Sequence, residues 1–264
     1  MLKIENVFKT FNAGTVNEKV ALQGLNLHLK EGDFVTVIGG NGAGKSTMLN
    51  AITGVFGVDA GKVLIDGVDV TQLPEYKRAR YIGRVFQDPM MGTAATMQIE
   101  ENLALASRRG QPRTLRTGIT KAEREEYREK LKILDLGLED RMTAKVGLLS
   151  GGQRQALTLL MATLQKPKLL LLDEHTAALD PKTAAKVLDA TQKIVEKDHL
   201  TTLMITHNMR DAIAYGNRLI MMYNGHIVVD VSGEEKKNLT VEQLLNLFSQ
   251  ASGSDEVDDK LVLS

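Results

Sequence analysis

The spacing of apolar positions divides the chain into segments with strand character and segments with helix character. Apolar and polar residues alternate from Leu2 to Val7 and from Ala21 to Leu29, which is typical of half-buried strands. Short apolar runs bounded by turn residues are typical of buried strands. We expect such shorter strands at 34–38, 61–67, 82–87, 168–173, 201–206 and 218–222. The pattern predicts an α/β chain.

A stretch with few β-branched runs interrupts this succession of strands. From about Ile99 to Leu164 almost every segment has helical periodicity, which indicates an inserted helical lobe. Helix starts are expected at the capping pairs Thr120 with Glu123 and Thr240 with Gln243, and at Ser150. We therefore predict a core at about 1–88 and 162–249, a helical subdomain at about 89–161, and an acidic, mobile tail at 250–264.

Composition excludes several classes of site. The chain has 264 residues, of which 43% are hydrophobic and 25% charged, so it can bury a sizeable core. Its formal net charge is zero, which argues against a nucleic-acid partner because such proteins usually have a basic surface. The lack of cysteine excludes disulfides and favours a reducing compartment. Met1 to Thr10 has the pattern of a strand rather than a signal peptide, and no apolar run approaches the roughly 20 residues that cross a bilayer.

A glycine-rich loop between the predicted strand 34–38 and a helical segment at 47–53 carries the clearest chemistry. The loop consists of Gly39, Gly40, Asn41, Gly42, Ala43, Gly44, Lys45, Ser46 and Thr47, and it fits the motif G-x-x-x-x-G-K-[ST]. A strand that enters a helix through glycines leaves backbone N–H groups free to bind phosphate. The motif predicts a nucleoside-triphosphate site in which Lys45 reaches the β- and γ-phosphates and Ser46 ligates Mg²⁺. The alternative is a turn that only connects a strand to a helix.

Two adjacent acids follow a buried strand farther along the chain. Leu169 to Leu172 are succeeded by Asp173 and Glu174, and the carboxyl ends of buried parallel strands face the ligand crevice. Asp173 is therefore expected to hold the Mg²⁺, and Glu174 to orient or deprotonate the attacking water. The alternative is a strand that merely ends at solvent with polar residues.

A third segment points to a family. Leu149 is followed by Ser150, Gly151, Gly152 and Gln153, which would present N–H groups to a second phosphate at a helix start. One chain with one triphosphate has no obvious need of two phosphate cradles, whereas two chains facing head to tail would complete each other's site. Over roughly 2–249 the sequence resembles the ATP-binding subunit of ABC transporters, for which Leu-Ser-Gly-Gly-Gln is a very specific signature.

The resemblance implies a fold and further site residues. The fold is that of a P-loop NTPase, with a RecA-like core of mainly parallel sheet, an antiparallel β subdomain and an inserted α-helical subdomain. Gln87 resembles the glutamine that senses Mg²⁺, and His207 the histidine that contacts the γ-phosphate. Ala178 to Asp180 resembles the loop that crosses the dimer axis. Phe11, expected in a loop, stands in the place of the aromatic that stacks on adenine, the alternative being a core phenylalanine.

The resemblance implies which residues of the site act in catalysis and which bind Mg²⁺. The catalytic residues would be Glu174, His207 and Gln87, and the metal ligands Ser46, Gln87 and Asp173. The partners implied are a second copy of the chain in an ATP-dependent head-to-tail homodimer, an integral membrane permease and, indirectly, a solute-binding protein. The expected location is peripheral, at the cytoplasmic face of the cell membrane.

Several alternatives to an importer subunit stay open at this point. The lack of a fused membrane domain favours import, but the chain could serve an exporter. Soluble ABC ATPases that act on ribosomes usually hold two sets of motifs, and DNA-repair ATPases separate theirs by long coiled coil. A P-loop GTPase would carry an Asn-Lys-x-Asp motif, which the sequence lacks.

One residue departs from the family pattern. The family usually reads Asp-Glu-Pro-Thr-Ser-Ala-Leu-Asp, whereas His175 replaces the rigidifying proline here. His175 either hydrogen-bonds near the site or is a neutral variant. The form His-Thr-Ala-Ala resembles a bacterial subgroup of importers with permeases similar to the branched-chain amino-acid type, some of them linked to aromatic amino acids. The expected solute is an amino acid, aromatic ones included, or a similar small molecule.

Four arginines lie close together between predicted helices. Arg108, Arg109, Arg113 and Arg116 are interspersed with glycine and proline and have no acids among them. Composition predicts a solvated, charged loop. The functional alternative is a contact with the permease or with acidic lipid headgroups.

Overall fold

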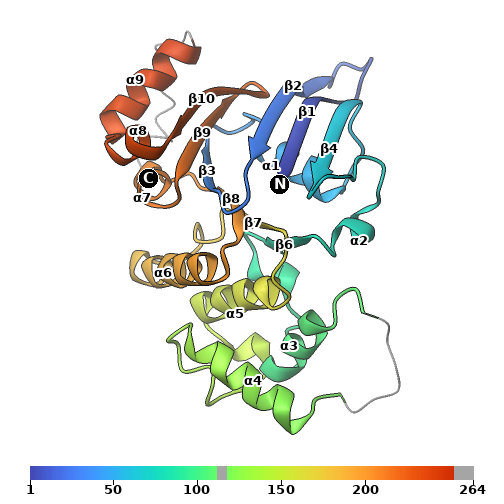
Figure 1. The fold of residues 1–264 in the computed structure, drawn as a ribbon, viewed down its shortest axis with the longest axis vertical. Coiled ribbons are helices and arrows are strands. Elements are labelled where there is room, and N and C mark those ends of the chain that lie inside the picture. Colours follow the sequence, from blue (N-terminus) through green and yellow to red (C-terminus); the bar gives the residue numbers. More distant parts are fainter. Residues whose placement is uncertain (112–117, 253–264) are drawn as a thin grey trace.

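The computed structural model describes residues 1–111 and 118–252, which form two sheets and a set of helices (Figure 1). The smaller sheet is antiparallel, in the order β2-β1-β4-β5. Its strands are β1 (Leu2–Phe11), β2 (Lys19–Leu29), β4 (Ala60–Ile65) and β5 (Val68–Asp69). Every second side chain along the start of β1 is buried, as at Leu2 and Ile4, so the alternation predicted the strand correctly. Phe11 was expected in a loop, but it is the last residue of β1 and lies opposite Lys19.

The larger sheet has six strands in the order β10-β9-β3-β8-β7-β6. They are β3 (Phe34–Ile38), β6 (Ile82–Val85), β7 (Leu169–Asp173), β8 (Thr201–Ile205), β9 (Arg218–Tyr223) and β10 (His226–Ser232). The pairs β6–β7, β7–β8, β8–β3 and β3–β9 are parallel, whereas β10 is antiparallel to β9. The carboxyl ends of β3, β7 and β8 therefore meet at one edge, where the predicted site residues begin.

Helix α1 (Lys45–Thr53) is packed between the two sheets. Its Met48, Leu49 and Ile52 belong to a buried cluster that also contains residues of β1, β2, β3, β4 and β7. Short helix α2 (Glu75–Arg78) follows β5, and the Arg78 guanidinium donates to the carbonyls of Ala51 and Ile52 in the last turn of α1. A cation at this end is favourable because the helix dipole is negative there.

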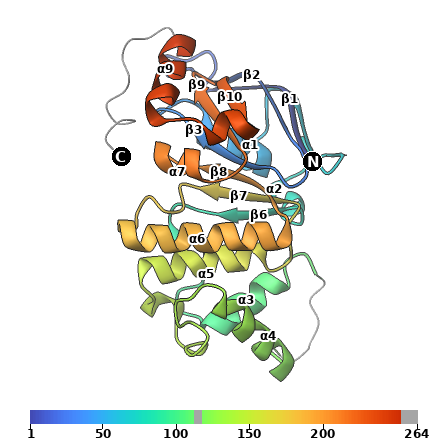
Figure 2. The same cartoon turned by 60° about the vertical axis from the view of Figure 1, so that its left-hand side comes forward.

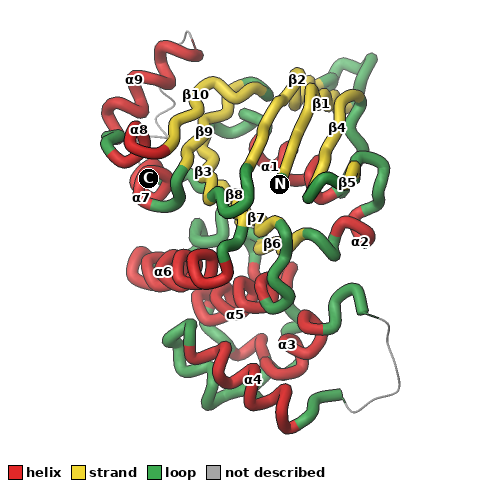
Figure 3. The backbone as a smooth tube through the Cα atoms, in the orientation of Figure 1, coloured by secondary structure: helices red, strands yellow, loops and turns green. Residues whose placement is uncertain are grey.

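The opposite face of the larger sheet is covered by α5 (Gly151–Thr163) and α6 (Pro181–Asp198). Figure 2 shows these two helices in successive layers below β6 and β7, with α3 (Ile99–Ser107) and α4 (Lys121–Lys132) beyond them. Two 3-10 turns, η1 (Pro89–Gly92) and η2 (Val146–Leu148), complete the insertion. Residues 133–145 form turns rather than the expected helix. Figure 3 shows the strands gathered in one half of the molecule and the inserted helices in the other.

The C-terminal part consists of α7 (Met209–Ala214), α8 (Gly233–Lys237) and α9 (Val241–Ser252). Helix α7 packs on β3, α8 on β9 and β10, and α9 on β10. The predicted cap of α9 is present, because the Thr240 hydroxyl accepts from the Gln243 N–H at 3.2 Å and the Gln243 amide oxygen accepts from the Thr240 N–H at 2.9 Å. Most of the tail predicted at 250–264 lies outside the described residues. Of the helices within 1–111 and 118–252, none is both long and apolar enough to span a membrane.

Candidate functional site

The glycine-rich loop runs from the carboxyl end of β3 into the first turn of α1. Gly44 is the N-cap of α1, with a φ of 104°. Because glycine has no side chain, no side chain caps the helix, and its first turn holds no acidic residue. A β-carbon at Gly44 would lie 2.8 Å from the Ala21 carbonyl oxygen, so only glycine fits this approach and this φ. The N–H groups in the first turn of α1 therefore have no side-chain acceptor and are available to bind an anion.

Lys45 lies along this loop. Its ammonium donates to the carbonyl oxygens of Gly39 at 2.6 Å and Gly40 at 3.1 Å, and the residue is 7% exposed. Burial lowers the pKa of Lys45, while the nearby carboxylates of Glu174 and Asp173 raise it. The loop lysine and the two acids therefore lie close enough to interact electrostatically. Ser46 is exposed, so its hydroxyl is accessible to a ligand.

Asp173, the last residue of β7, is held by an arginine that sequence reasoning missed. Arg84 of β6 places Nη2 3.1 Å from Asp173 Oδ2 and Nη1 3.4 Å from Thr53 Oγ1, and its guanidinium lies 4.6 Å from the centre of the Phe86 ring. The Nε atom is buried without a hydrogen-bond partner. The signal in the sequence was one charged residue inside the otherwise apolar run 82–86.

Glu174 follows directly and adopts a left-handed backbone, with a φ of 46°. This conformation costs a residue with a β-carbon roughly 1–2 kcal/mol. Its N–H donates to the Ile205 carbonyl at 3.1 Å, and its Oε2 lies 3.9 Å from Nδ1 of His207. The structure therefore brings the predicted base and the predicted γ-phosphate histidine together at the ends of β7 and β8.

Gln87 lies two residues beyond the end of β6 and is exposed. The segment before it is anchored to the helical insertion, because the Gln155 amide of α5 donates to the Phe86 carbonyl at 3.1 Å. Gln87 lies between β6 and the 3-10 turn η1, and its predicted role toward Mg²⁺ stays a prediction.

The Ser150 segment opens α5 with reciprocal hydrogen bonds. The Ser150 hydroxyl accepts from the Gln153 N–H at 3.3 Å, and the Gln153 amide oxygen accepts from the Ser150 N–H at 3.2 Å. A β-carbon at Gly152 would lie 2.0 Å from Cγ2 of Thr183 on α6. Among residues 1–111 and 118–252, no hydrogen bond or ion pair joins this segment to the loop at 39–47.

Two residues pair with each other where β1 ends and β2 begins, and one of them reaches the glycine-rich loop. Phe11 packs edge-on against Phe56, with ring centres 5.2 Å apart. Opposite Phe11, Lys19 places its ammonium 3.5 Å from the position of a β-carbon on Gly42. Sequence reasoning did not single out Lys19, because its position depends on irregular pairing between β1 and β2.

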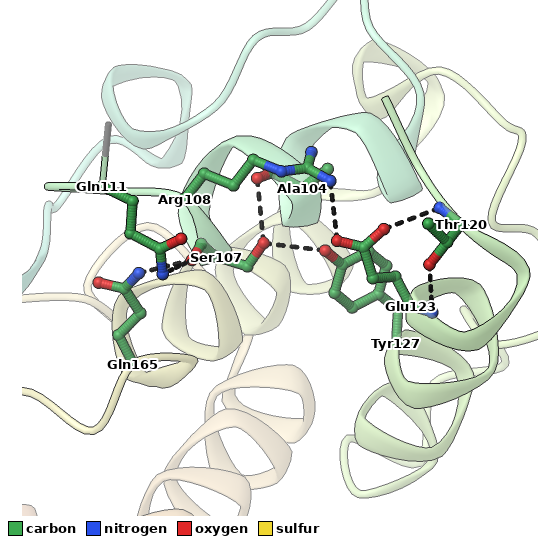
Figure 4. Close-up of polar contacts among 8 residues, drawn as sticks. All are labelled: Ala104, Ser107, Arg108, Gln111, Thr120, Glu123, Tyr127 and Gln165. Carbon is green, nitrogen blue, oxygen red and sulfur yellow. Dashed lines mark hydrogen bonds and ion pairs between the residues drawn. The ribbon is translucent and has the colours of Figure 1, made fainter. Parts of the chain in front are cut away.

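The arginine-rich segment is more structured than its composition predicts. Figure 4 shows Arg108 bonded to Glu123, with Nη2 2.8 Å from Oε1, and Ser107 bonded to Tyr127 at 2.9 Å. Burial lowers the pKa of Arg109, and its Nε is buried without a partner. Arg108 therefore links the end of α3 to α4, and both arginines are partly buried rather than fully solvated as the composition predicted. Arg113 and Arg116 lie outside the described residues.

The proposed donors fit magnesium only when a nucleotide supplies further ligands. The described part of the chain contains no group of three or more His, Asp or Glu side chains that could hold a metal ion. Ser46, Gln87 and Asp173 offer a hydroxyl, an amide and a carboxylate oxygen, all hard donors. Mg²⁺ is usually bound by one or two such groups together with substrate phosphates and water, so the set suits it.

Comparison with known proteins agrees with this geometry. The ABC transporter family model matches residues 22–177, which include the glycine-rich loop, the Ser150 segment and both acids. The chain belongs to the ABC transporter family. It is an ATP-binding and ATP-hydrolysing subunit of the ABC type.

Individual relatives extend the match over almost the whole chain. A tyrosine transport ATP-binding protein of Clostridioides difficile is 44% identical over 251 residues, covering 95% of this chain and 100% of the relative. The spermidine/putrescine import ATP-binding protein PotA of Pasteurella multocida is 30% identical, covering 99% of this chain and 68% of the relative. Among solved structures, a dimeric ATP-binding cassette in a post-hydrolysis state bound to ADP and Pi matches with a TM-score of 0.75 at 33% identity, over 88% of this chain and 98% of that one.

Proposed function

We propose that two copies of this chain close head to tail around ATP and Mg²⁺, and that hydrolysis drives uptake of an amino acid through a separate membrane permease. The observation that carries the proposal is the grouping of Lys45, Asp173, Glu174 and His207 around the open start of α1. Phosphoryl transfer requires mainly positioning and charge neutralisation, and these four side chains offer a cation, a metal ligand, a base and a phosphate contact.

Each residue has a distinct task in this proposal. The N–H groups at the start of α1 and the Lys45 ammonium bind the β- and γ-phosphates. Ser46, Asp173 and Gln87 hold Mg²⁺, which supplies charge neutralisation on the phosphate oxygens. The Glu174 carboxylate accepts the proton of the attacking water, and His207 donates a hydrogen bond to the γ-phosphate.

The second half of the site comes from the partner copy. Ser150 and Gly151 are exposed at the start of α5, where a partner copy could reach them. In a head-to-tail dimer, Ser150 to Gln153 of each copy would approach the γ-phosphate bound to the other, while Phe11 and Lys19 contact the nucleotide in the copy that binds it. The dimeric state of the solved relative bound to ADP and Pi supports this arrangement.

The transported solute and the other partners follow from the relatives. The protein of Clostridioides difficile is named for tyrosine transport and PotA for import of polyamines, which favours import and, given the higher identity to the former, an amino acid such as tyrosine. An integral membrane permease and a solute-binding protein would complete the machine, with this chain peripheral at the cytoplasmic face of the membrane. An exporter is the alternative.

Glu174→Gln tests the proposed hydrolysis site. The amide keeps the shape but cannot accept the proton, so ATP turnover should fall by about 10²–10⁴-fold, the usual contribution of a general base. ATP should then accumulate uncleaved and hold a dimer that gel filtration detects. Glu129→Gln, on the exposed face of α4, is the matched control and should behave as wild type. Wild-type turnover in Glu174→Gln would show that another group is the base.

Uptake tests the transport proposal separately. The chain, co-expressed with its permease in a strain lacking tyrosine uptake, should restore accumulation of labelled tyrosine, and Glu174→Gln should not. ATP-dependent efflux of the label from loaded vesicles would instead support an exporter.

A further inference from the structure

His175 occupies an unusual place for a histidine. It directly follows Glu174, yet it is only 2% exposed. Its Nε2 lies 3.2 Å from Oγ1 of Thr191 on α6, a residue that is 1% exposed. The side chain therefore points away from the nucleotide site and into the layer between the larger sheet and α6. A buried polar group of this kind is costly unless it is hydrogen-bonded.

The neighbouring bonds determine the direction of this hydrogen bond. The Thr191 hydroxyl has one proton, and it donates that proton to the Val187 carbonyl at 2.8 Å. The Thr191 oxygen must therefore accept from His175, so the ring carries its proton on Nε2. His175 is thus a fixed donor from the segment after β7 to α6.

The segment that this donor anchors begins at a strained residue. Glu174 has a φ of 46°, and its carbonyl accepts from the Ala177 N–H at 3.0 Å. A left-handed residue with a β-carbon persists only where its surroundings hold it. On one side, the Ile205 carbonyl holds the Glu174 N–H at 3.1 Å. On the other side, the next residue along the chain is tied to α6 by the His175–Thr191 bond.

We propose that His175 is a positioning residue for Glu174: its hydrogen bond to Thr191 fixes the turn that directs the Glu174 carboxylate toward the attacking water, in place of the proline that usually rigidifies this turn. The inference rests on Glu174 being the base, as proposed above. Loosening the bond should affect the chemical step while leaving the nucleotide-binding groups on β3 and α1 in place. A change in turnover without a change in ATP affinity would therefore separate positioning from general loss of structure.

Thr191→Val is the main test, because valine has nearly the shape of threonine and lacks the acceptor. It leaves the His175 donor buried and unpaired, and an unpaired buried group costs about 1–3 kcal/mol. If the turn moves to relieve that cost, the turnover number should fall by roughly 5- to 150-fold, with the affinity for ATP within about twofold of wild type. Thr191→Ser, which retains the hydroxyl, should restore turnover.

Matched variants separate this effect from loss of stability. Thr163 on α5 is buried and donates to the Leu159 carbonyl within its own helix at 2.9 Å, so Thr163→Val removes a comparable hydroxyl away from His175 and should keep wild-type turnover. His175→Gln preserves an N–H donor near the Nε2 position and should retain more turnover than His175→Leu. Assays are run at a temperature where thermal unfolding shows every variant to be folded.

A spectroscopic measurement reports on the bond itself. With ¹⁵N-labelled histidine, wild type should show a protected Nε2–H proton on this ring. Thr191→Val should lose the protection. Unchanged turnover in Thr191→Val, or an equal loss in Thr163→Val, would overturn the inference even if Glu174→Gln is inactive. Full turnover in Glu174→Gln would instead overturn the proposed function on which it rests.

Discussion

Helices α1 and α5 both begin at a glycine-containing segment that the sequence assigns to phosphate, yet they begin in opposite ways. At the start of α1, the N-cap is Gly44 and no side chain caps the helix. At the start of α5, Ser150 and Gln153 cap each other's backbone N–H groups. The first helix therefore offers free donors to a ligand, whereas the second has already satisfied two of its donors within the chain.

The two helix starts also differ in what packs around them. The start of α1 is fixed between two sheets, and Lys45 is folded onto the adjoining loop. The start of α5 packs against the segment that leads into α6, since β-carbons at Gly151 and Gly152 would meet Leu179 and Thr183. That segment begins at Glu174. In the proposed dimer, the start of α1 would bind the nucleotide of its own chain, whereas the start of α5 would contact the nucleotide of the partner.

The largest effect is expected from damage to the open start. Lys45→Ala removes a charged donor to phosphate, and such bonds contribute about 1.5–3 kcal/mol, so ATP affinity should fall by roughly 10- to 150-fold. Turnover should be lost altogether, because negative charge develops on the leaving β-phosphate oxygen in the transition state and Lys45 would neutralise it. Calorimetric titration with ATP measures the affinity, and Lys62→Ala, at an exposed position of β4, is the control. Equal ATP affinity in Lys45→Ala and wild type would remove Lys45 from the site.

Mixing two inactive variants tests whether the two helix starts belong to one shared site. Lys45→Ala destroys the open start, and Ser150→Arg adds bulk that blocks the partner's phosphate. A mixed dimer has one doubly damaged site and one with both halves native. Equal mixing makes about half of the dimers mixed, so turnover should return to about a quarter of the wild-type value.

Nucleotide trapping is measured together with turnover in this mixture, because a dimer with one intact site can bind ATP even where hydrolysis requires two intact sites. Mixed dimers that form but neither trap nor cleave ATP would show that each site lies within one chain.

Much of the difference between the starts of α1 and α5 could be predicted from the sequence, because it depends on local signals. A buried strand before the glycines, and serine or threonine followed three residues later by glutamine or glutamate, are patterns within a few residues. The capping pairs at Thr120, Ser150 and Thr240 were all correctly placed. The hairpin between β9 and β10 was missed although Asn224 and Gly225 carry its turn signal and both have positive φ.

The features that escaped prediction depend on residues far apart in the chain. Arg84 meets Asp173 only because β6 pairs in parallel with β7, with Val85 opposite Leu172. Phe11 continues β1 because shifts of register let the β1–β2 pair extend to Lys19. Neither register nor bulges can be deduced from the periodicity of one segment.

A steric clash introduced at the start of α5 should have a smaller effect than loss of Lys45. Gly152→Ala would place a methyl group 2.0 Å from Cγ2 of Thr183, and overpacking of this kind costs typically about 1–3 kcal/mol. Gly151→Ala is the matched control, since its methyl group would meet Leu179 at an ordinary 3.5 Å. Urea unfolding should show a lower free energy of unfolding for Gly152→Ala, and a neutral or slightly raised one for Gly151→Ala because alanine favours a helix. Similar values for the two variants would show that α5 and α6 move apart readily here.

The smallest effect should come from opening the cap of α5. Ser150→Ala removes the hydroxyl that accepts from the Gln153 N–H, and loss of an N-cap typically costs about 1 kcal/mol of unfolding free energy. Because the start of α1 does not depend on this cap, the affinity of the monomer for ATP should not change. Ser150→Thr keeps the cap and should retain wild-type stability. If Ser150→Ala weakened ATP binding by the monomer, the two helix starts would be coupled within one chain, and the contrast between an open and a self-capped start would no longer explain the need for a partner.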